Sequence, residues 1–203
     1  MNKNIETEFS KMVNLTKNEL LVISGFFKTK HYKKGEYFLE EGKLCDYIGF
    51  VDKGLFYYFY NDNGVQHTRG FFFPNNFISD YSSFLKNKKS KAFIQALEDC
   101  SVTLLHKEDV NTLYEKLPKF YELSNNIVQE LYLDVSEKYE SFLIKSAEER
   151  YLELINNRPS LFQKIPQYML ASYIGVTPEG LNRIKSAFPK NNLHFITQIN
   201  AWI

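Results

Sequence analysis

Residues 167–185 read QYMLASYIGVTPEGLNRIK, a stretch in which Gly175 separates two short segments with a helical pattern. The apolar positions of the two segments recur every three to four residues: Leu170, Ile174, Leu181 and Ile184. Thr177 and Pro178 are typical of a helix start, because threonine caps a helix and proline fits its first turn. We therefore expect one helix to end at Gly175 and a second to begin directly after Thr177.

The spacing within this stretch matches a helix-turn-helix when Gln167 is counted as the first position. The fifth position must be small because the two helices cross there, and it is Ala171. The ninth must take a left-handed conformation that glycine adopts at low cost, and it is Gly175. The expected buried positions are Leu170, Ile174, Val176, Leu181 and Ile184. An ordinary helical hairpin is the alternative, but the joint match of these positions favours a helix-turn-helix.

The second helix of this motif would present polar side chains on its free face. We expect DNA contacts from Thr177, Glu179, Gly180, Asn182, Arg183, Lys185 and Ser186. Side chains of these types reach base edges and phosphates in a major groove. The local charge agrees, since residues 161–203 carry four basic side chains and one acidic one, on a chain whose net charge is +1. Phosphate contacts require such a local excess of basic residues.

Between His31 and Leu105 the sequence changes to short runs of β-branched and aromatic residues, separated by Gly, Asn and Asp. The predicted strands include 37–39, 47–51, 55–60, 68–73, 93–97 and 102–105. Asn63-Gly64, between two of these runs, predicts a two-residue hairpin turn. Many short strands at even spacing predict a small all-β barrel or jelly roll. The aromatic fraction of 16% predicts a core built of large rings.

Helical patterns flank the predicted barrel. Thr16 with Glu19, and Ser146 with Glu149, are predicted capping boxes that each start a helix. Between them, residues 118–144 carry an apolar stripe at helical spacing: Leu123, Ile127, Leu131, Val135, Tyr139 and Phe142. We expect this long helix to form a homodimer through the stripe, the alternative being that it packs on its own domain.

The predicted architecture is an α+β chain in three parts. Residues 1–117 would form the barrel sensor domain with N-terminal helices, residues 118–145 the dimerisation helix, and residues 146–203 the helix-turn-helix domain. Only nineteen residues follow Ile184, and they contain no evident β-hairpin with a glycine turn. We therefore expect the wing that often follows such a motif to be reduced or absent.

Several classes of function are disfavoured by what the chain contains. Two cysteines, Cys45 and Cys100, are too few for a disulfide framework, an iron–sulfur cluster or a four-thiolate metal site, and we expect buried free thiols. His31, His67 and His106 are isolated candidates for a haem ligand, and each is more typical of a surface histidine. A cupin-type enzyme, the leading catalytic alternative, would need clustered histidine and carboxylate ligands.

No enzyme motif, phosphate loop, signal peptide or membrane-length apolar run is visible. We expect a cytoplasmic protein that is not an enzyme, with no metal, no resident cofactor and no membrane partner.

The order of these parts resembles the Crp/Fnr family of bacterial transcription regulators. The resemblance is carried by residues 35–42, 47–54 and 167–184, and residues 146–151 resemble members from Bacteroidetes-type bacteria. It implies a barrel that senses a signal, a dimer formed by the long helix, and a second motif helix that reads double-stranded DNA. RNA polymerase is a further expected partner.

Two positions of the second motif helix bear on the DNA sequence that is read. In the family, a Glu and an Arg four residues later contact bases, and Glu179 and Arg183 stand at those positions. Pro178 stands where an Arg is frequent, so the operator should differ from that of the cAMP receptor protein.

The sensing residues depart from the family pattern. Cyclic-nucleotide binders hold the ribose with a Gly-Glu pair and the phosphate with an Arg. Here Ser79 and Asp80 fall on the pair, and Ser90, flanked by Lys89 and Lys91, falls on the arginine. These five residues define the candidate ligand pocket, which lacks the bidentate phosphate clamp that lysine cannot replace. We expect no cAMP binding. Another small-molecule effector, a barrel without ligand, and a module of this fold that has lost DNA binding are the alternatives.

Overall fold

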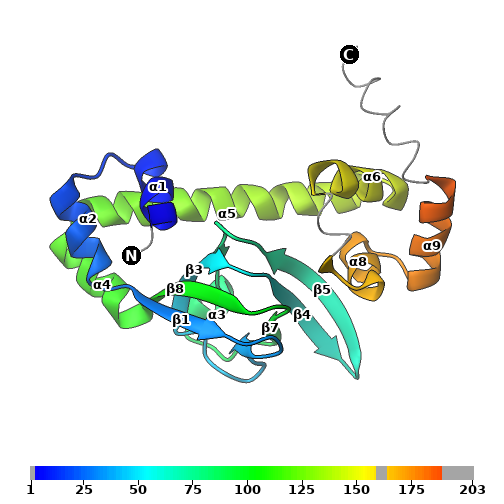
Figure 1. Cartoon of the computed structure of the whole chain (residues 1–203), viewed down its shortest axis with the longest axis horizontal. Helices are drawn as coiled ribbons and strands as arrows, with labels where there is room; N and C mark the ends of the chain where they lie inside the picture. The colour runs from blue at the N-terminus through cyan, green and yellow to red at the C-terminus, as the bar shows by residue number, and fades with distance from the viewer. Residues whose placement is uncertain (1–2, 159–163, 189–203) are drawn as a thin grey trace, which may run out of the picture. The chain divides into compact units, whose positions relative to one another are not determined.

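The computed structural model of the chain describes residues 3–158 and 164–188 (Figure 1). The chain forms two compact units, Met1–Val65 with Arg69–Ser136, and Gln66–Thr68 with Glu137–Ile203. The boundary between the units therefore falls inside the long helix. Residues 118–145, which we expected to form a separate part, are divided between the two units.

The elements that precede the long helix comprise helices at both ends, with strands and the short helix α3 between them. In chain order they are α1 (Lys3–Met12), α2 (Lys17–Ser24), β1 (Lys28–Tyr32), β2 (Tyr37–Leu39), β3 (Tyr47–Lys53), β4 (Phe56–Asp62), β5 (Val65–Phe72), β6 (Phe77–Ile78), α3 (Tyr81–Lys86), β7 (Ala92–Ala96), β8 (Cys100–His106) and α4 (Lys107–Lys116).

In the described residues the strands form two four-stranded sheets, with the orders β1-β8-β3-β6 and β2-β7-β4-β5. Most successive strands change sheet, so neighbours within a sheet come from distant parts of the sequence. The last strand, β8, lies between β1 and β3 and pairs antiparallel with both. Such alternation closes a double-stranded jelly roll. The predicted α+β class and jelly-roll barrel are confirmed.

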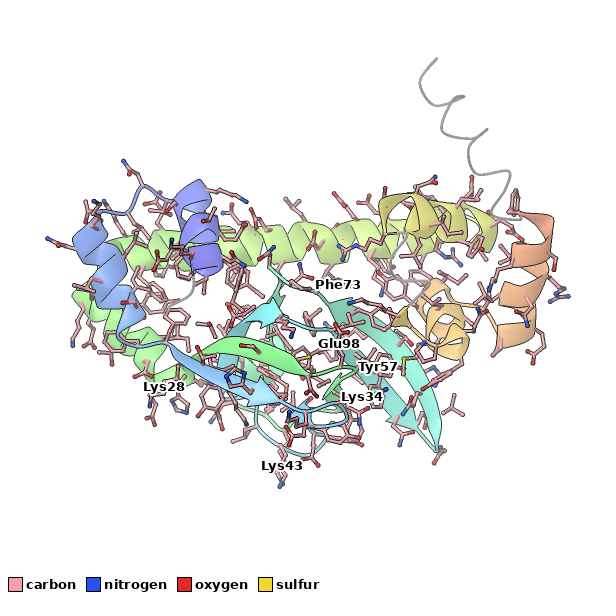
Figure 2. All side chains as sticks on the ribbon, viewed as in Figure 1. Lys28, Lys34, Lys43, Tyr57, Phe73 and Glu98 are labelled. Atoms are coloured by element: carbon pink, nitrogen blue, oxygen red, sulfur yellow. The ribbon has the colours of Figure 1, made fainter. Side chains whose placement is uncertain are left out.

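Large apolar side chains fill the barrel. Phe50, Phe56 and Ile94 are fully buried, and the Tyr32 ring packs edge-on against Phe56 at a centroid distance of 5.5 Å. On β7, buried and half-buried residues alternate, as expected for a strand with one face toward a core. Among the residues labelled in Figure 2, Tyr57 is buried, whereas Lys28, Lys34 and Lys43 are exposed.

The β4–β5 hairpin turns at Asn63 and Gly64, as the sequence predicted. Both residues have positive φ, 50° and 87°. A two-residue turn with positive φ at both positions matches the twist of the flanking strands, and Asn-Gly is its preferred sequence.

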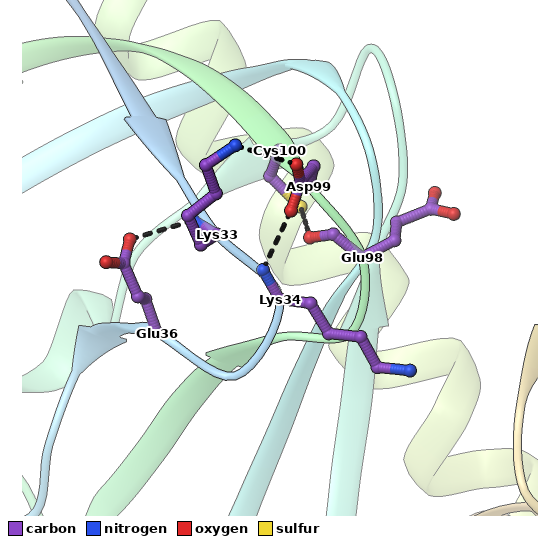
Figure 3. Close-up of polar contacts among 6 residues, drawn as sticks. All are labelled: Lys33, Lys34, Glu36, Glu98, Asp99 and Cys100. Carbon is purple, nitrogen blue, oxygen red and sulfur yellow. Dashed lines mark hydrogen bonds and ion pairs between the residues drawn. The ribbon is translucent and has the colours of Figure 1, made fainter.

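One carboxylate ties the turn between β1 and β2 to the turn before β8 (Figure 3). Asp99 accepts a hydrogen bond from the Lys34 backbone N–H at 3.0 Å and pairs with Lys33 Nζ at 3.0 Å. The hydrogen bond from Lys33 is the largest cause that lowers the pKa of Asp99 below its ordinary value. Glu36 also accepts from the Lys33 backbone N–H, at 2.8 Å. Since exposed ion pairs add little stability, these contacts mainly define turn geometry.

The first predicted capping box starts α2. Thr16 Oγ1 accepts from the Glu19 N–H at 3.3 Å, and the Glu19 carboxylate accepts from the Thr16 N–H at 2.7 Å. The preceding helix, α1, packs Ile5 and Phe9 into the barrel's core cluster. The Asn126 side chain donates to the Met12 carbonyl oxygen at 3.1 Å, which fixes the end of α1 to the long helix.

The long helix α5 (Pro118–Ile144) has the predicted bounds, but the placement of Leu123 in the predicted dimer stripe is wrong. Leu123 is fully buried in the barrel core, and Ile127 is partly buried against the same cluster. Both residues cover the helix's own domain, so Leu123 is not available to a partner. Helical periodicity alone cannot separate a stripe that covers its own barrel from one that faces outward.

The second unit contains the C-terminal end of α5, followed by α6 (Ala147–Asn157), α8 (Gln167–Ile174) and α9 (Pro178–Ala187). The second predicted capping box is present: Ser146 Oγ accepts from the Glu149 N–H at 3.2 Å, and Glu149 accepts from the Ser146 N–H at 2.7 Å. The prediction of a reduced wing concerns a segment most of which, from residue 189 onward, lies outside the described residues.

Candidate nucleic-acid interface

The helix α8 ends at a left-handed glycine, as the sequence predicted. Gly175 has φ +79° and ψ +35°, and the Val176 N–H donates to the Ala171 carbonyl oxygen at 2.9 Å. This bond satisfies one of the carbonyls that a helix end leaves without an intrahelical partner. The next helix begins at once, because Thr177 Oγ1 accepts from the Gly180 N–H at 3.1 Å and Pro178 occupies the first turn.

The two helices pack through the positions that the motif specifies. Ala171 is fully buried, which permits the close crossing. The motif's apolar positions Leu170, Ile174, Leu181 and Ile184 are also buried, and Val176 is partly buried. The helix-turn-helix is therefore a small unit with its own core, and α9 turns its other face to solvent.

The predicted DNA-contacting residues lie on α9 and its cap. Glu179, Asn182, Arg183 and Ser186 are exposed and follow helical spacing, so they share one face. Gly180 and Lys185 are partly exposed at its edges. Thr177 is exposed, but its hydroxyl is occupied in the cap.

The electrostatics of this face are mixed in sign. Its acidic member is Glu179, whose pKa is lowered by its own backbone N–H at the helix start, then by the Thr177 hydroxyl, and further by the charge of Arg183. The carboxylate is therefore ionised at neutral pH and acts as a hydrogen-bond acceptor. A guanidinium beside it is a donor, so the face offers both groups that base edges require.

The C-terminal half of α5 carries an exposed row of apolar side chains. It comprises Leu131, Val135, Tyr139 and Phe142, which are 39%, 51%, 65% and 41% exposed, together with Tyr132 and Leu143. We call these six residues the α5 stripe. Exposed apolar surface of this extent on a helix is typical of an interaction site.

The five residues of the predicted ligand pocket do not form one open site. Asp80 and Ser90 meet, since Ser90 Oγ donates to Asp80 Oδ2 at 2.7 Å and both residues are buried. Ser79 donates instead to the Tyr47 carbonyl oxygen at 3.1 Å. Lys89 and Lys91 are exposed.

Two further residues of the barrel lie near this Asp–Ser pair and carry chemistry that sequence reasoning missed. The Tyr58 hydroxyl is buried and has no hydrogen-bond partner among the described residues. Burial raises the pKa of Tyr58, the charge of Arg69 opposes the rise, and the charge of Asp80 adds to it. The Arg69 guanidinium lies 4.9 Å from the Tyr58 ring centroid and donates to Tyr60 Oη at 2.5 Å. The barrel thus has an arginine on β5 rather than at position 90.

The predicted thiols are confirmed as free and buried. Cys45 and Cys100 are 3% and 4% exposed, and burial raises the pKa of both. Among the described residues, no group of three or more His, Cys, Asp or Glu side chains is arranged to hold a metal ion. None of the described helices is both long and apolar enough to cross a membrane.

Comparison with known proteins agrees with this geometry. Residues 29–116 match the family model of the cyclic nucleotide-binding domain. The catabolite activator protein of Thermus thermophilus has a similar structure, with 21% identity and a TM-score of 0.55 over 88% of this chain and 86% of that one. FixK2 from Bradyrhizobium japonicum is similar at 16% identity and a TM-score of 0.66, over 82% and 86% of the two chains. No curated protein sequence matches this chain.

A third similar structure, from Eubacterium rectale, is described as a transcriptional regulator of the Crp/Fnr family. It has 19% identity to this chain and a TM-score of 0.69, and the alignment covers 89% of this chain and 86% of the other. The chain has the Crp/Fnr fold. The resemblance seen in the sequence is thereby confirmed at the level of the fold, and the matched domain lies within the predicted barrel.

Functional residues that are close together in the sequence could be predicted, whereas those brought together only by packing could not. The helix-turn-helix positions are adjacent in the chain, so their spacing identifies them. The place of Arg69 beside Tyr58 depends on strand pairing, which no local sequence pattern predicts. Arg150, whose contacts are described below, lies in a stretch that supported the resemblance, but no spacing rule assigns it a function.

Proposed function

We propose that this chain is a dimeric, sequence-specific DNA-binding transcription regulator of the Crp/Fnr type, with a barrel that does not bind cAMP. Two copies would join through α5, each α9 would enter a major groove, and RNA polymerase would be the partner through which transcription changes. The proposal is for a regulator rather than an enzyme, acting in the cytoplasm.

The α9 face is the observation that carries the proposal. An ordinary helical hairpin needs neither a left-handed glycine at the turn nor a capped, proline-started second helix. Here these features occur together with an outward row of donors and acceptors on α9. Glu179 and Arg183, one turn apart, supply an acceptor and a donor of the kinds that read cytosine and guanine edges.

The α5 stripe supports the dimer. Its exposed apolar side chains are out of place on a monomer's surface, and a second copy of the same helix would cover them in a twofold arrangement. A dimer would also present two α9 helices to two half-sites on one DNA duplex.

The Asp80–Ser90 pair supports the absence of cAMP binding. A cyclic phosphate requires a cation at the site that Ser90 fills, and Ser90 instead donates to a buried carboxylate. That carboxylate would repel a phosphate placed beside it. The barrel remains a candidate site for an effector of different chemistry.

The direct test of DNA binding is a mobility shift on the DNA upstream of the protein's own coding sequence, against scrambled DNA of equal length and composition. We expect a shift at low salt that prefers the upstream DNA. Equal shifts on both duplexes, or none, would refute sequence-specific binding. The chain would then be a ligand-binding or interaction module of the same fold.

The test for cAMP is a titration calorimetry experiment on the purified chain, with cAMP at up to millimolar concentration. We expect no binding heat and no change in the unfolding temperature, because a ligand that binds only the folded state must raise that temperature. A saturable heat would overturn this part of the proposal.

A further inference from the structure

One arginine outside the helix-turn-helix joins the ends of two helices in the second unit. Arg150 lies in the first turn of α6, and its Nε donates to the carbonyl oxygen of Ile174, the last residue of α8, at 3.0 Å. Its Nη1 donates to the carbonyl oxygen of Lys145, directly after the end of α5, at 2.5 Å. Helix C-termini leave carbonyls without intrahelical partners and carry partial negative charge. A single guanidinium therefore neutralises two helix ends at once.

Beneath this arginine, the turn of the helix-turn-helix packs on the last turns of α5. The Arg150 guanidinium carbon lies 4.6 Å from the centroid of the Phe142 ring. A Cβ atom added to Gly175 would lie 2.8 Å from Phe142 Cε1, so the turn approaches that ring as closely as a glycine allows. One turn earlier on α5, Lys138 Nζ lies 4.0 Å from the centroid of the Tyr173 ring.

These contacts fix the direction of α9 relative to the end of α5. The two helices of the motif share a buried core, so α9 follows α8, and α8 is attached to α5 through Arg150 and the Gly175–Phe142 contact. We propose that Arg150 is a positioning residue that sets the angle between α9 and the C-terminal end of α5, and thereby the spacing of the two operator half-sites that a dimer reads. The spacing part of this inference rests on the proposed function.

Arginine is specifically suited to this place. Its planar guanidinium can donate in two directions while its face stacks on an aromatic ring. A lysine would keep the charge but has a single nitrogen and no flat face, so it cannot make the same three contacts. We therefore expect Arg150→Lys to behave like Arg150→Met rather than like the wild-type chain.

The matched control is Lys145→Met. It removes one positive charge from the same junction, but the Lys145 side chain pairs with Glu153 at 2.8 Å and takes no part in the contacts of Arg150, which uses only the Lys145 carbonyl. Changes caused by lost charge alone should therefore appear in both variants, and changes caused by lost positioning only in the Arg150 variants.

The experiment measures the affinity of each variant for a series of DNA duplexes that differ only in the spacing between the two half-sites. The wild-type chain first selects a duplex from a random library, and the selected half-sites are then moved apart or together by one and two base pairs. We expect wild type and Lys145→Met to prefer one spacing. Arg150→Met should bind that duplex about tenfold more weakly, because the second α9 helix is no longer held in position to reach its half-site. It should also discriminate less among half-site spacings. Affinity for a single half-site should stay within about twofold of wild type.

A second measurement does not depend on DNA. Hydrogen exchange should be faster in Arg150→Met than in wild type or Lys145→Met at the backbone amides of residues 142–145 and 174–176. A folded Arg150→Met chain with the wild-type spacing profile and unchanged exchange would overturn the proposal. If the wild-type chain selects no DNA, the proposed function and the spacing claim both fail. The exchange data would then still decide whether Arg150 fixes the junction.

Discussion

Arg183 is the residue on which the proposed base reading depends most directly. It is exposed on α9, one turn after Glu179, and its charge contributes to lowering the pKa of that carboxyl. In the proposed complex the two groups would act on neighbouring base pairs as a donor and an acceptor. In contrast, Thr177 and Pro178 serve the start of the helix.

Replacing Arg183 should therefore reduce specificity rather than general DNA affinity. We expect Arg183→Ala to weaken binding to the selected operator by about 1–3 kcal/mol and to relax base preference at one position. Lys185→Ala is the contrasting variant and should weaken binding to all sequences alike. Anisotropy titrations on matched and mismatched duplexes measure both, and equal losses on every duplex for Arg183→Ala would contradict a base contact.

Gly175 meets two constraints at once, a left-handed φ and a close neighbour, as Gly54 beside Cys100 also does. Its φ of +79° lies in the left-handed region, and its Cα faces the Phe142 ring. Gly42 has nearly the same φ, +80°, but a Cβ atom there would have no neighbour within 4 Å. Comparing substitutions at Gly175 and Gly42 therefore separates the effect of backbone conformation on stability from the effect of packing.

We expect Gly175→Ala to destabilise the chain more than Gly42→Ala. A left-handed alanine costs about 1–2 kcal/mol at either place. The overlap with Phe142 should add about 1–3 kcal/mol at Gly175 only. Denaturant unfolding, followed with a probe in each unit, gives the two free energies. Equal losses would mean that the turn moves away from Phe142 without penalty.

At the scale of elements, the two capping boxes begin helices in different units. In each, a carboxylate accepts the N–H of the cap residue, and the backbone bond from Ser146 is the largest cause of the lowered pKa of Glu149. A carboxyl whose pKa is lowered by folding stabilises the folded state above its ordinary pKa. That contribution disappears as the pH falls through the lowered value.

The Glu149→Gln variant tests this linkage. The stability difference between wild type and variant should be present at neutral pH and shrink as the pH falls below the ordinary value of 4.5. Glu148→Gln, one position earlier and also exposed, is the control for general charge effects at the helix start. Unfolding curves at several pH values measure the differences, and a pH-independent difference for Glu149→Gln would contradict the capping role.

Caps and turns, which are determined by a few neighbouring residues, could be predicted from the sequence. Features determined by contacts between distant residues could not. The capping boxes, the Asn63-Gly64 turn and the Gly175 turn each rest on a few neighbouring residues. Strand β1 reads KTKHY with one buried residue, so no alternation of apolar residues revealed it. The burial of Leu123 was equally invisible, because one helical stripe covers the barrel at one end and faces solvent at the other.

The candidate sites also divide into those set by neighbouring residues and those set by contacts between distant elements. The polar face of α9 could be identified from spacing within one motif. The Asp80–Ser90 hydrogen bond, the position of Arg69 over Tyr58, and the contacts of Arg150 with two helix ends each join separate elements of a unit. Such contacts are determined by how the elements pack, and no local pattern encodes them.

At the scale of the whole molecule, the α5 stripe is the feature that a single copy leaves unexplained. Its six residues are apolar or aromatic, and every one is at least 39% exposed. In a twofold dimer the stripe would face itself, so each side chain would lose its contact with water in both copies. The same symmetry makes the stripe sensitive to charge, because one substitution introduces two like charges into the interface.

Leu131→Glu should therefore dissociate the dimer. Two carboxylates would be brought together with no cation opposite them in the stripe, which is strongly unfavourable for buried charges. Sedimentation velocity at micromolar concentration should give a dimer for wild type and a species near 23.9 kDa for the variant. Leu21→Glu makes the same change on α2, where Leu21 is 72% exposed outside the stripe, and should remain dimeric. The monomeric variant should lose affinity for a two-half-site operator but keep that for one half-site, since each α9 is intact. A wild-type chain that sediments as a monomer, or a Leu131→Glu chain that stays a dimer, would contradict assembly through this stripe.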